Sequence, residues 1–451
     1  MNFPVWDVPL IGGGLLIGFI AILHVFVAHF AVGGGLFLVW TEALAVRRRD
    51  EALLGYVRRH SSFFVLLVLV FGAVSGVGIW WSIGLVHPPA TSTLIHTFVW
   101  GWAIEWVFFF VEIAAAFVYY YGWDRLDRRT HLIVGWIYFA AAWLSLFVIN
   151  GILTFMLTPG RWLATHSFLD AFFNPTMLPS AVVRTASAIA LAGLYALLTA
   201  SVIGDEPLRH KVTRYSAGWV LVGVAVLPLA GAWFIGSIPA FAREMSMGGA
   251  PAVTIFAGLS VLLSALIVAI AYLGPYRHPQ FSNVLLAGIL AMLGLGVTGV
   301  TEWVREAVRK PYVIYDYMYS NGIRKEEVSR LTEAGILSVA KWVTVAGVEP
   351  GRELEAGREI FRVSCRNCHT IDGYNGIRLM VKGWREDFID YQLQRLDELK
   401  GFMPPFAGTP AERRALAKWL FQVGRSAPFT DPTPTPGHAG AAGLQMGEVT
   451  R

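Results

Sequence analysis

Long apolar segments separated by short polar loops occupy the first two thirds of the chain. A helix needs about 20 mostly apolar residues to cross a bilayer, and eight runs are long enough. The pattern therefore predicts an all-α fold, in which residues 1–312 form a polytopic transmembrane helix bundle. We place the eight spans at residues 13–40, 62–85, 94–121, 132–156, 179–203, 215–237, 252–274 and 281–304.

The last third of the chain has a different, more polar pattern. Residues 313–350 are amphipathic and are expected to link the membrane bundle to a small soluble helical domain at 351–426. The segment 427–451 is rich first in Pro and then in Gly and Ala. Such a composition buries too little apolar surface to fold, so we expect a disordered tail there.

Basic residues are distributed unequally among the predicted loops. The alternate loops hold little that is basic beyond Arg161 and Arg243. By the positive-inside rule the N-terminus lies outside, and an even number of spans also puts the C-terminus outside. The loops after the first, third, fifth and seventh spans carry the others: Arg47, Arg48, Arg49, Arg58, Arg59, Arg125, Arg128, Arg129, Arg209, Lys211, Arg214 and Arg277.

Composition supports a membrane protein, since 55% of the residues are hydrophobic and only 15% are charged. The formal net charge of +5 then reflects basic cytoplasmic loops and gives no reason to expect a nucleic-acid partner. We expect a multi-pass protein of the bacterial inner membrane, in contact with lipid. Its C-terminal domain is expected in the periplasm.

Both cysteines of the chain lie in one motif, Cys365-Arg366-Asn367-Cys368-His369. The spacing C-x-x-C-H attaches a c-type haem: the two thiols bond to the porphyrin and the adjacent His ligates the iron. A redox disulfide of thioredoxin type would need a βαβ context, which the pattern lacks. The sequence therefore predicts one covalent haem c on Cys365, Cys368 and His369, on the outer side where such haems are attached in bacteria.

The second axial ligand is expected downstream, in the sequence G-F-M-P-P-F. Met403 is its natural thioether, and His/Met ligation raises the haem potential; a core methionine is the alternative. Gly357 and Phe361 precede the haem motif on a helix, and a closing helix is expected at 410–423. In these features residues 351–425 resemble small class I cytochromes c.

Ionisable side chains at membrane depth are rare and by default mark a ligand site or a proton path. His24 and His29 lie in the first span. Five residues correspond to about 140° around a helix, so the two imidazoles are expected to serve different neighbours. A hydrogen-bonded structural histidine is the alternative for each. The glycine run 33–35 would let a macrocycle or another helix approach closely.

Two carboxylates occupy the aromatic third span. Glu105 and Glu112 are seven residues apart, so they share one helix face about 10.5 Å apart along the axis. Such groups are costly in a membrane unless paired, protonated or liganding. One could contact an iron while the other passes protons towards it. A structural salt bridge is the alternative, although the spans offer few internal cations.

Charges also occur near the ends of later spans. His131 begins the fourth span and is expected to be structural and interfacial. Arg184, near the outer end of the fifth, needs a carboxylate or a haem propionate. In the eighth span Glu302, Glu306 and Arg309 fall on one stripe, and an ordinary juxtamembrane charge cluster is the alternative there.

Taken together, spans one to eight resemble subunit I of cytochrome bd-type quinol oxidases. The resemblance rests on His24, on A-I-E and F-F-F-V-E of span three running into G-W-D-R-L, and on the N-P at 174–175. It also rests on E-A-V-R-K-P-Y, which is similar to the family signature E-x-G-R-Q-P-W. In that family the matching His and Glu residues surround two high-spin haems where oxygen is reduced.

The resemblance implies roles for these residues. His24, Glu105 and Glu306 would be haem ligands or near-ligands, Glu112 a proton relay and Arg309 a propionate partner. It also implies two non-covalent haems of b or d type. Further candidates for contact with these cofactors are His29, Arg184 and Trp303.

The sequence departs from the family at the expected electron entry. Val183 or Arg184 stands where a span-five His should ligate a low-spin haem, and span seven has no Met. The long quinol-binding loop is missing, since 204–214 is a short turn. The cytochrome c domain stands in place of the family's ninth span.

Three functions remain open from the sequence. The first is a respiratory terminal oxidase, in which a periplasmic electron-transfer protein reduces the c haem and the membrane haems reduce oxygen. The second is a quinol:cytochrome c oxidoreductase with the reverse flow. The third is a non-catalytic haem-bearing anchor that connects a larger redox complex to the membrane. For the oxidase we also expect a second bd-type membrane subunit.

Overall fold

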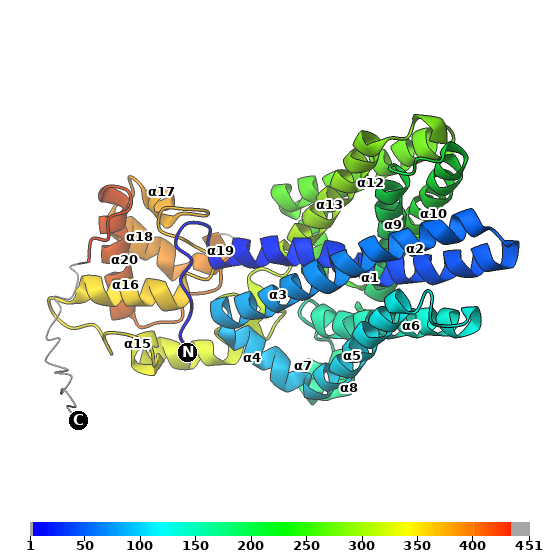
Figure 1. Cartoon of the computed structure of the whole chain (residues 1–451). Helices are drawn as coiled ribbons and strands as arrows, with labels where there is room; N and C mark the ends of the chain where they lie inside the picture. The colour runs from blue at the N-terminus through cyan, green and yellow to red at the C-terminus, as the bar shows by residue number, and fades with distance from the viewer. Residues whose placement is uncertain (1–2, 400, 434–451) are drawn as a thin grey trace, which may run out of the picture. The chain divides into compact units, whose positions relative to one another are not determined.

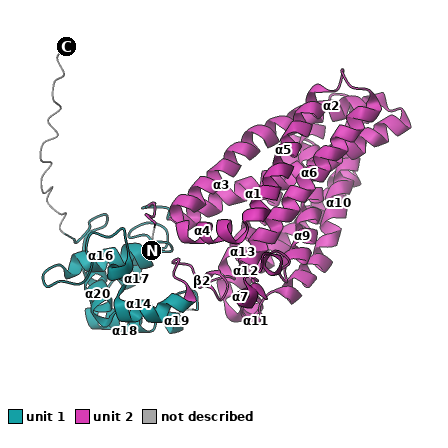
Figure 2. Ribbon diagram, turned by 90° about the horizontal axis from the view of Figure 1, so that it is seen from below, with its two compact units in different colours: residues 1–2, 7–12, 326–451 teal, residues 3–6, 13–325 magenta. Residues whose placement is uncertain are grey.

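The computed structural model describes residues 3–399 and 401–433, and these form two compact units (Figure 2). The first, a membrane bundle, comprises residues 3–6 and 13–325. The second, a C-terminal domain, comprises residues 7–12 and the described residues from Glu326 onward. Each unit is described by itself below.

The predicted number of spans is confirmed: eight helices of the described chain are long and apolar enough to cross a membrane. Figure 1 shows them as long helical ribbons. They are α1 (Gly13–Arg48), a second span of α2 (Glu51–Val65), η1 (Leu66–Gly72) and α3 (Ala73–Val86), α5 (Val99–Tyr121), α6 (Arg128–Phe155), α9 (Met177–Ala200), α10 (Glu206–Ser237), a seventh span of α12 (Pro251–Ala271) and η3 (Tyr272–Tyr276), and α13 (Val284–Ala307).

The second span begins eleven residues before its predicted start. Asp50 caps α2, because its side chain accepts a hydrogen bond from the Leu53 amide over 3.1 Å. The first turns carry polar residues, so hydropathy alone places the start of this helix too late. The π-helical turn η1 then joins α2 to α3 without a break.

Helix α9 is the centre of the bundle. Of its most apolar window 61% is buried, against 28% or less for each other span. Gly33, the first residue of the glycine run of α1, faces this centre: a Cβ on it would lie 1.9 Å from the Ala188 carbonyl oxygen. The run therefore allows helices to pack closely, as small residues do in membrane bundles.

Short elements connect the spans. His87 caps α4: its Nδ1 accepts from the Ala90 amide, and its Nε2 donates to the Ser320 carbonyl over 2.8 Å. Burial lowers the pKa of His87 to about 4, so the ring is neutral at pH 7. The connecting elements are α4 (Pro88–Thr97), α7 (Trp162–Thr165), α8 (Phe168–Phe172), α11 (Ala240–Glu244), η2 (Met245–Gly249), η4 (Pro279–Phe281) and an antiparallel pair of strands, β1 (Tyr312–Ile314) and β2 (Met318–Tyr319).

The C-terminal domain is helical, with α16 packed across α20. The rings of Phe361 and Trp419 lie 5.0 Å apart in this contact. The buried carboxylate of Glu412 accepts from the amides of Ile336 and Leu337 over 2.9 and 2.8 Å. The domain contains η5 (Lys325–Glu327, which begins at the boundary), α14 (Val328–Ala334), α15 (Ile336–Val339), α16 (Glu353–Ser364), α17 (Ile377–Val381), α18 (Glu386–Gln394), α19 (Leu396–Leu399) and α20 (Pro410–Arg425).

The domain extends beyond its predicted ends. Helices α14 and α15 belong to it, although the sequence suggested a linker at 313–350. The predicted tail began at 427, but residues 427–433 pack on the domain: the Trp419 indole donates to the Thr433 hydroxyl over 3.0 Å. The Pro-rich composition of this segment gave no indication of the hydrogen bond between Trp419 and Thr433. The remaining tail prediction, for 434–451, lies outside the described residues.

Candidate functional site

The C-x-x-C-H motif forms a tight turn after α16. The amides of Cys368 and His369 both donate to the Cys365 carbonyl, over 3.1 and 3.0 Å. Cys365 is half-buried and Cys368 exposed, and neither forms a disulfide. Burial raises the pKa of the Cys365 thiol to about 12. The His369 Nδ1 donates to the Asn375 carbonyl over 3.1 Å, which makes Nε2 the ring nitrogen that can ligate a metal.

The residues after the motif are held by an ion pair and by the N-terminal segment. Arg378 donates to Asp372 over 2.5 Å, and this contact lowers the pKa of the Asp372 carboxyl. The Tyr374 amide donates to the Leu10 carbonyl over 2.8 Å, and Asp7 forms an ion pair with Arg366 of the motif. Residues 7–12 thus pack beside the candidate haem-attachment turn. Met403 is half-buried in its loop.

Both glutamates of the third predicted span are hydrogen-bonded to hydroxyls of α6. Ser145 donates to Glu105 over 2.9 Å, and Tyr138 donates to Glu112 over 3.2 Å. In the described chain no cation pairs with either carboxylate. The structure therefore does not support the salt-bridge interpretation of this pair.

A third buried group lies on the same helices, and the sequence analysis missed most of it. Glu42 of α1 accepts from the Tyr119 hydroxyl over 2.7 Å and from the His131 Nδ1 over 2.8 Å. The His131 Nε2 donates to the Tyr119 carbonyl over 2.9 Å. Glu42 and His131 are 0% and 1% exposed, so both side chains are enclosed by the protein. The sequence feature that could have revealed this group is its partner Glu42, a single carboxylate in an apolar span.

His24 lies on α1 opposite the second span. Its Nδ1 is 3.1 Å from the Ser75 hydroxyl, and a Cβ on Gly76 would lie 3.2 Å from its Cε1. His24 is half-buried rather than enclosed. With Nδ1 occupied by Ser75, Nε2 is the ring nitrogen that can ligate a metal.

A second cluster joins α1, α9 and α13. Glu302 accepts from Arg305 over 2.7 Å and interacts electrostatically with Arg184 and His29. The His29 Nδ1 donates to the Val25 carbonyl over 2.8 Å, within its own helix. The Nε of Arg184 is buried and has no hydrogen-bond partner in the described part of the chain. Arg184 therefore has both a carboxylate neighbour and one unsatisfied donor.

The end of α13 holds a third charged group. Glu306 pairs with Arg309 and lies 3.3 Å from the Lys310 Nζ. Arg309 is 4% exposed, donates to the Val313 carbonyl and has a buried Nε with no partner among the described residues. Burial, with the charge of Arg305, lowers the pKa of Arg309. Trp303 stacks on Phe256 with ring centres 4.4 Å apart.

Comparisons with known proteins agree with this arrangement. The family model for cytochrome bd terminal oxidase subunit I matches residues 15–240, which is just over half of the chain. The chain belongs to this family. A model for the cytochrome c domain described as "Cytochrome C oxidase, cbb3-type, subunit III" matches residues 352–420.

Solved structures support the fold. The bd oxidase from Geobacillus thermodenitrificans is 16% identical, with a TM-score of 0.58. The match covers 67% of this chain and 87% of that one, and it shows a shared fold. No curated protein matches the chain. A cytochrome bd subunit I fold is thus fused to a cytochrome c domain, as the sequence predicted, and this pairing suggests respiratory electron transfer by an oxidoreductase.

The bd-like bundle brings together only some of the predicted haem residues. Glu302 interacts electrostatically with Arg184 and His29, whereas Glu306 pairs with Arg309 and lies near Lys310. No hydrogen bond or ion pair within the described residues joins His24, Glu105 and Glu306. Residues that would hold a haem need not touch one another, because the macrocycle would separate them.

Several donors in this cytochrome bd-family chain suit haem. His24 and His369 each keep one ring nitrogen hydrogen-bonded, as metal-ligating imidazoles usually do. The unsatisfied Nε atoms of Arg184 and Arg309 suit an anionic propionate. The two thiols of the C-x-x-C-H turn suit covalent attachment.

Proposed function

We propose that the protein is the haem-bearing subunit of a bd-like terminal oxidase that receives electrons through its own c-type haem. Cys365 and Cys368 bind that haem covalently, and His369 and Met403 ligate its iron. His24, Glu105 and Glu306 hold or adjoin two non-covalent haems of b or d type in the bundle. When bound, such a haem with an open coordination position supplies the site at which oxygen is reduced.

The observation that carries this proposal is the pairing of Glu105 with Ser145 and of Glu112 with Tyr138. A salt bridge would fix the charge of each glutamate, whereas a hydroxyl partner accepts either protonation state. Oxygen reduction consumes protons, so an oxidase needs such groups inside the membrane. A protein that carried electrons alone would have no use for them.

The chain's other residues would orient and neutralise the cofactors. Arg184 and Arg309 each offer a buried unsatisfied Nε to a propionate. Trp303, held flat against Phe256, offers an aromatic face on α13. His29 interacts electrostatically with Arg184 and Glu302. The expected partners are a second bd-type membrane subunit and a periplasmic electron donor, with the C-terminal domain outside the inner membrane.

Oxygen consumption by the purified complex tests the proposal. A reduced soluble c-type cytochrome is offered as donor, and a quinol is offered in a parallel assay. We expect sustained oxygen uptake with the cytochrome, and its loss in the double variant Cys365→Ala/Cys368→Ala, which has no thiol to attach the haem but keeps the bundle. Glu244→Gln, a change in an exposed carboxylate, is the control and keeps full activity.

The same assays distinguish the alternatives. Quinol oxidation that reduces added cytochrome c without oxygen uptake would replace the oxidase by a quinol:cytochrome c oxidoreductase. Electron exchange with the donor, without net reaction with either substrate, would indicate that the protein is a haem-bearing membrane anchor.

A further inference from the structure

Titratable and hydroxyl side chains form three levels on facing sides of α5 and α6. On α5 Glu105, Glu112 and Tyr119 follow at intervals of seven residues, and on α6 His131, Tyr138 and Ser145 do the same. The helices run antiparallel, so each residue of one set faces one of the other. Seven residues advance a helix by about 10.5 Å in two turns, which keeps each set on one face.

Hydrogen bonds occur at every level. The outer level is Glu105 with Ser145, the middle level is Glu112 with Tyr138, and the inner level is Tyr119 with His131 and Glu42. Helix α1 follows the same seven-residue spacing, since Gly35 lies seven residues before Glu42. A Cβ on Gly35 would lie 2.2 Å from the Tyr138 Cε1, so this glycine makes room for the middle level.

At the inner level one proton can be held either by His131 or by Glu42. The Tyr119 carbonyl only accepts, so the His131 Nε2 carries a hydrogen. A second hydrogen must lie between the His131 Nδ1 and Glu42, 2.8 Å apart. Whether the nitrogen or the oxygen holds it, the pair has no net charge, and full burial costs less than for a lone ion.

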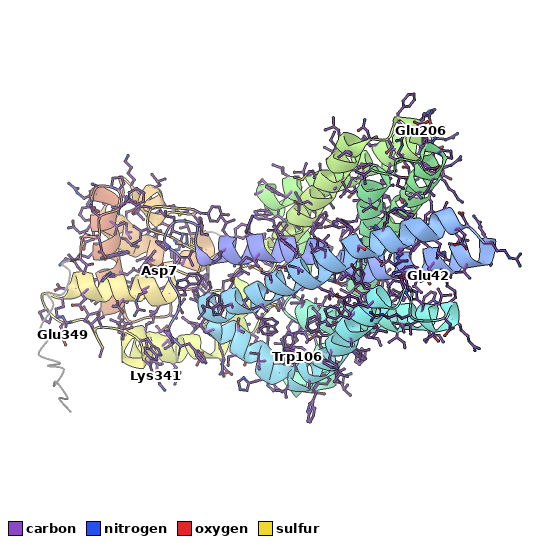
Figure 3. The ribbon with its side chains drawn as sticks, viewed as in Figure 1. Asp7, Glu42, Trp106, Glu206, Lys341 and Glu349 are labelled. Atoms are coloured by element: carbon purple, nitrogen blue, oxygen red, sulfur yellow. The ribbon has the colours of Figure 1, made fainter. Side chains whose placement is uncertain are left out.

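The inner level also lies at the end of the bundle where protons would enter. Tyr119 is near the end of α5 and His131 near the start of α6; Arg125 lies in the loop between these helices, and Arg128 begins α6. By the positive-inside rule this end faces the cytoplasm. Figure 3 marks Glu42 near the end of α1 that is far from the N-terminus.

We propose that Glu42, His131 and Tyr119 form a proton-loading site, which takes up protons from the cytoplasmic side and supplies them to Glu112 and Glu105. This inference rests on the proposed oxidase function and extends its proton path by one level. A gap of about 10 Å between levels is too long for direct transfer, so water molecules bridge it. The proton moves from the Glu42–His131 pair to the next carboxylate, and the pair is reloaded from the cytoplasm.

Proton uptake by the purified holo-complex in lipid vesicles tests the site. A pH-sensitive dye follows uptake when the haems are reduced without oxygen, so the readout does not depend on turnover. We expect Glu42→Gln to slow uptake on the order of 10²-fold, within the range for removing a positioned proton carrier. Haem content and the CO-difference spectrum should stay as in the wild type. Glu51→Gln, an exposed carboxylate at the same end, is the matched control with normal uptake.

A milder variant covers the case that Glu42→Gln does not assemble. Tyr119→Phe removes only the hydroxyl that donates to Glu42 and should slow uptake about tenfold, as expected for one hydrogen bond to a charged group. Wild-type uptake rates in these variants, with intact spectra, would overturn the inference. Failure of the oxidase proposal would appear elsewhere, as a wild-type complex that neither binds CO nor consumes oxygen.

Discussion

The hydroxyl of Tyr138 lies 3.2 Å from a carboxylate oxygen of Glu112, and the same hydroxyl lies 3.1 Å from the Ala31 carbonyl. A tyrosine has one hydrogen to donate. Both contacts are satisfied at once when Glu112 is protonated, because it can then donate to the tyrosine oxygen while Tyr138 donates to Ala31. The geometry therefore accommodates Glu112 with and without a proton, which is the property of a relay.

Replacing Glu112 should stop proton delivery without dismantling the site. We expect Glu112→Gln to lower the rate of oxygen reduction by roughly 10²–10⁴-fold, since glutamine keeps the size of the side chain but its amide cannot take up and release a proton. Single-turnover kinetics after mixing the reduced complex with oxygen would measure this step. A rate within twofold of wild type would remove Glu112 from the path.

The reduction potential of the c haem tests whether Met403 is its second axial ligand. Met403→Leu should leave the haem covalently attached but lower its reduction potential, by a measurable part of the roughly 0.8 V over which axial ligands act. Met380→Leu, in an exposed methionine of the same domain, is the control. A redox titration that finds the same potential in all three proteins would exclude Met403 as ligand.

The packing of α16 on α20 depends on a glycine. A Cβ on Gly357 would lie 2.3 Å from the Ala415 carbonyl oxygen, which is backbone and cannot move aside easily. We expect Gly357→Ala to lower the free energy of unfolding of the C-terminal domain by about 1–3 kcal/mol. Thermal unfolding followed at the c-haem absorbance would measure the loss. Gly347→Ala, which meets no atom within 4 Å, should be neutral.

The Asp372–Arg378 ion pair predicts how the domain responds to acid. Because Arg378 lowers the pKa of Asp372 in the folded state, the pair stabilises the domain fully above the ordinary carboxyl pKa of about 4. This stability is lost as the pH falls through the lower, folded-state pKa. Asp372→Asn should therefore be less stable at pH 7, by about 3 kcal/mol, and should lose less on acidification. Equal acid sensitivity in both proteins would contradict the assignment.

Local sequence was enough for the number of spans and for the cytochrome c domain. Apolar runs of bilayer length need no tertiary information, and C-x-x-C-H is a covalent signature in itself. The predicted boundaries were wrong where a helix cap or a contact between residues distant in sequence sets the end of an element. The start of α2 depends on Asp50, and the packing of residues 427–433 depends on a hydrogen bond from Trp419.

Partners of the buried charges could not be predicted, because they depend on the packing register of helices far apart in sequence. Ser145 and Tyr138 are ordinary residues until α6 packs on α5 and brings them to Glu105 and Glu112. Glu42 and His131 are 89 positions apart. Of the predicted eighth-span stripe, Glu302 and Glu306 lie on α13 and Arg309 follows its end; each glutamate pairs with the arginine three positions on.

The reduced-plus-CO minus reduced optical spectrum of the purified complex tests the central claim most directly. CO binds a reduced haem iron only where a coordination position is open, so an oxidase must respond. The account predicts a CO-induced shift in a b- or d-haem band that is lost in His24→Ala and persists in Met403→Leu, where CO also binds the opened c-haem iron. A spectrum without any CO response, from a complex with one c haem and six-coordinate b haems, would contradict it.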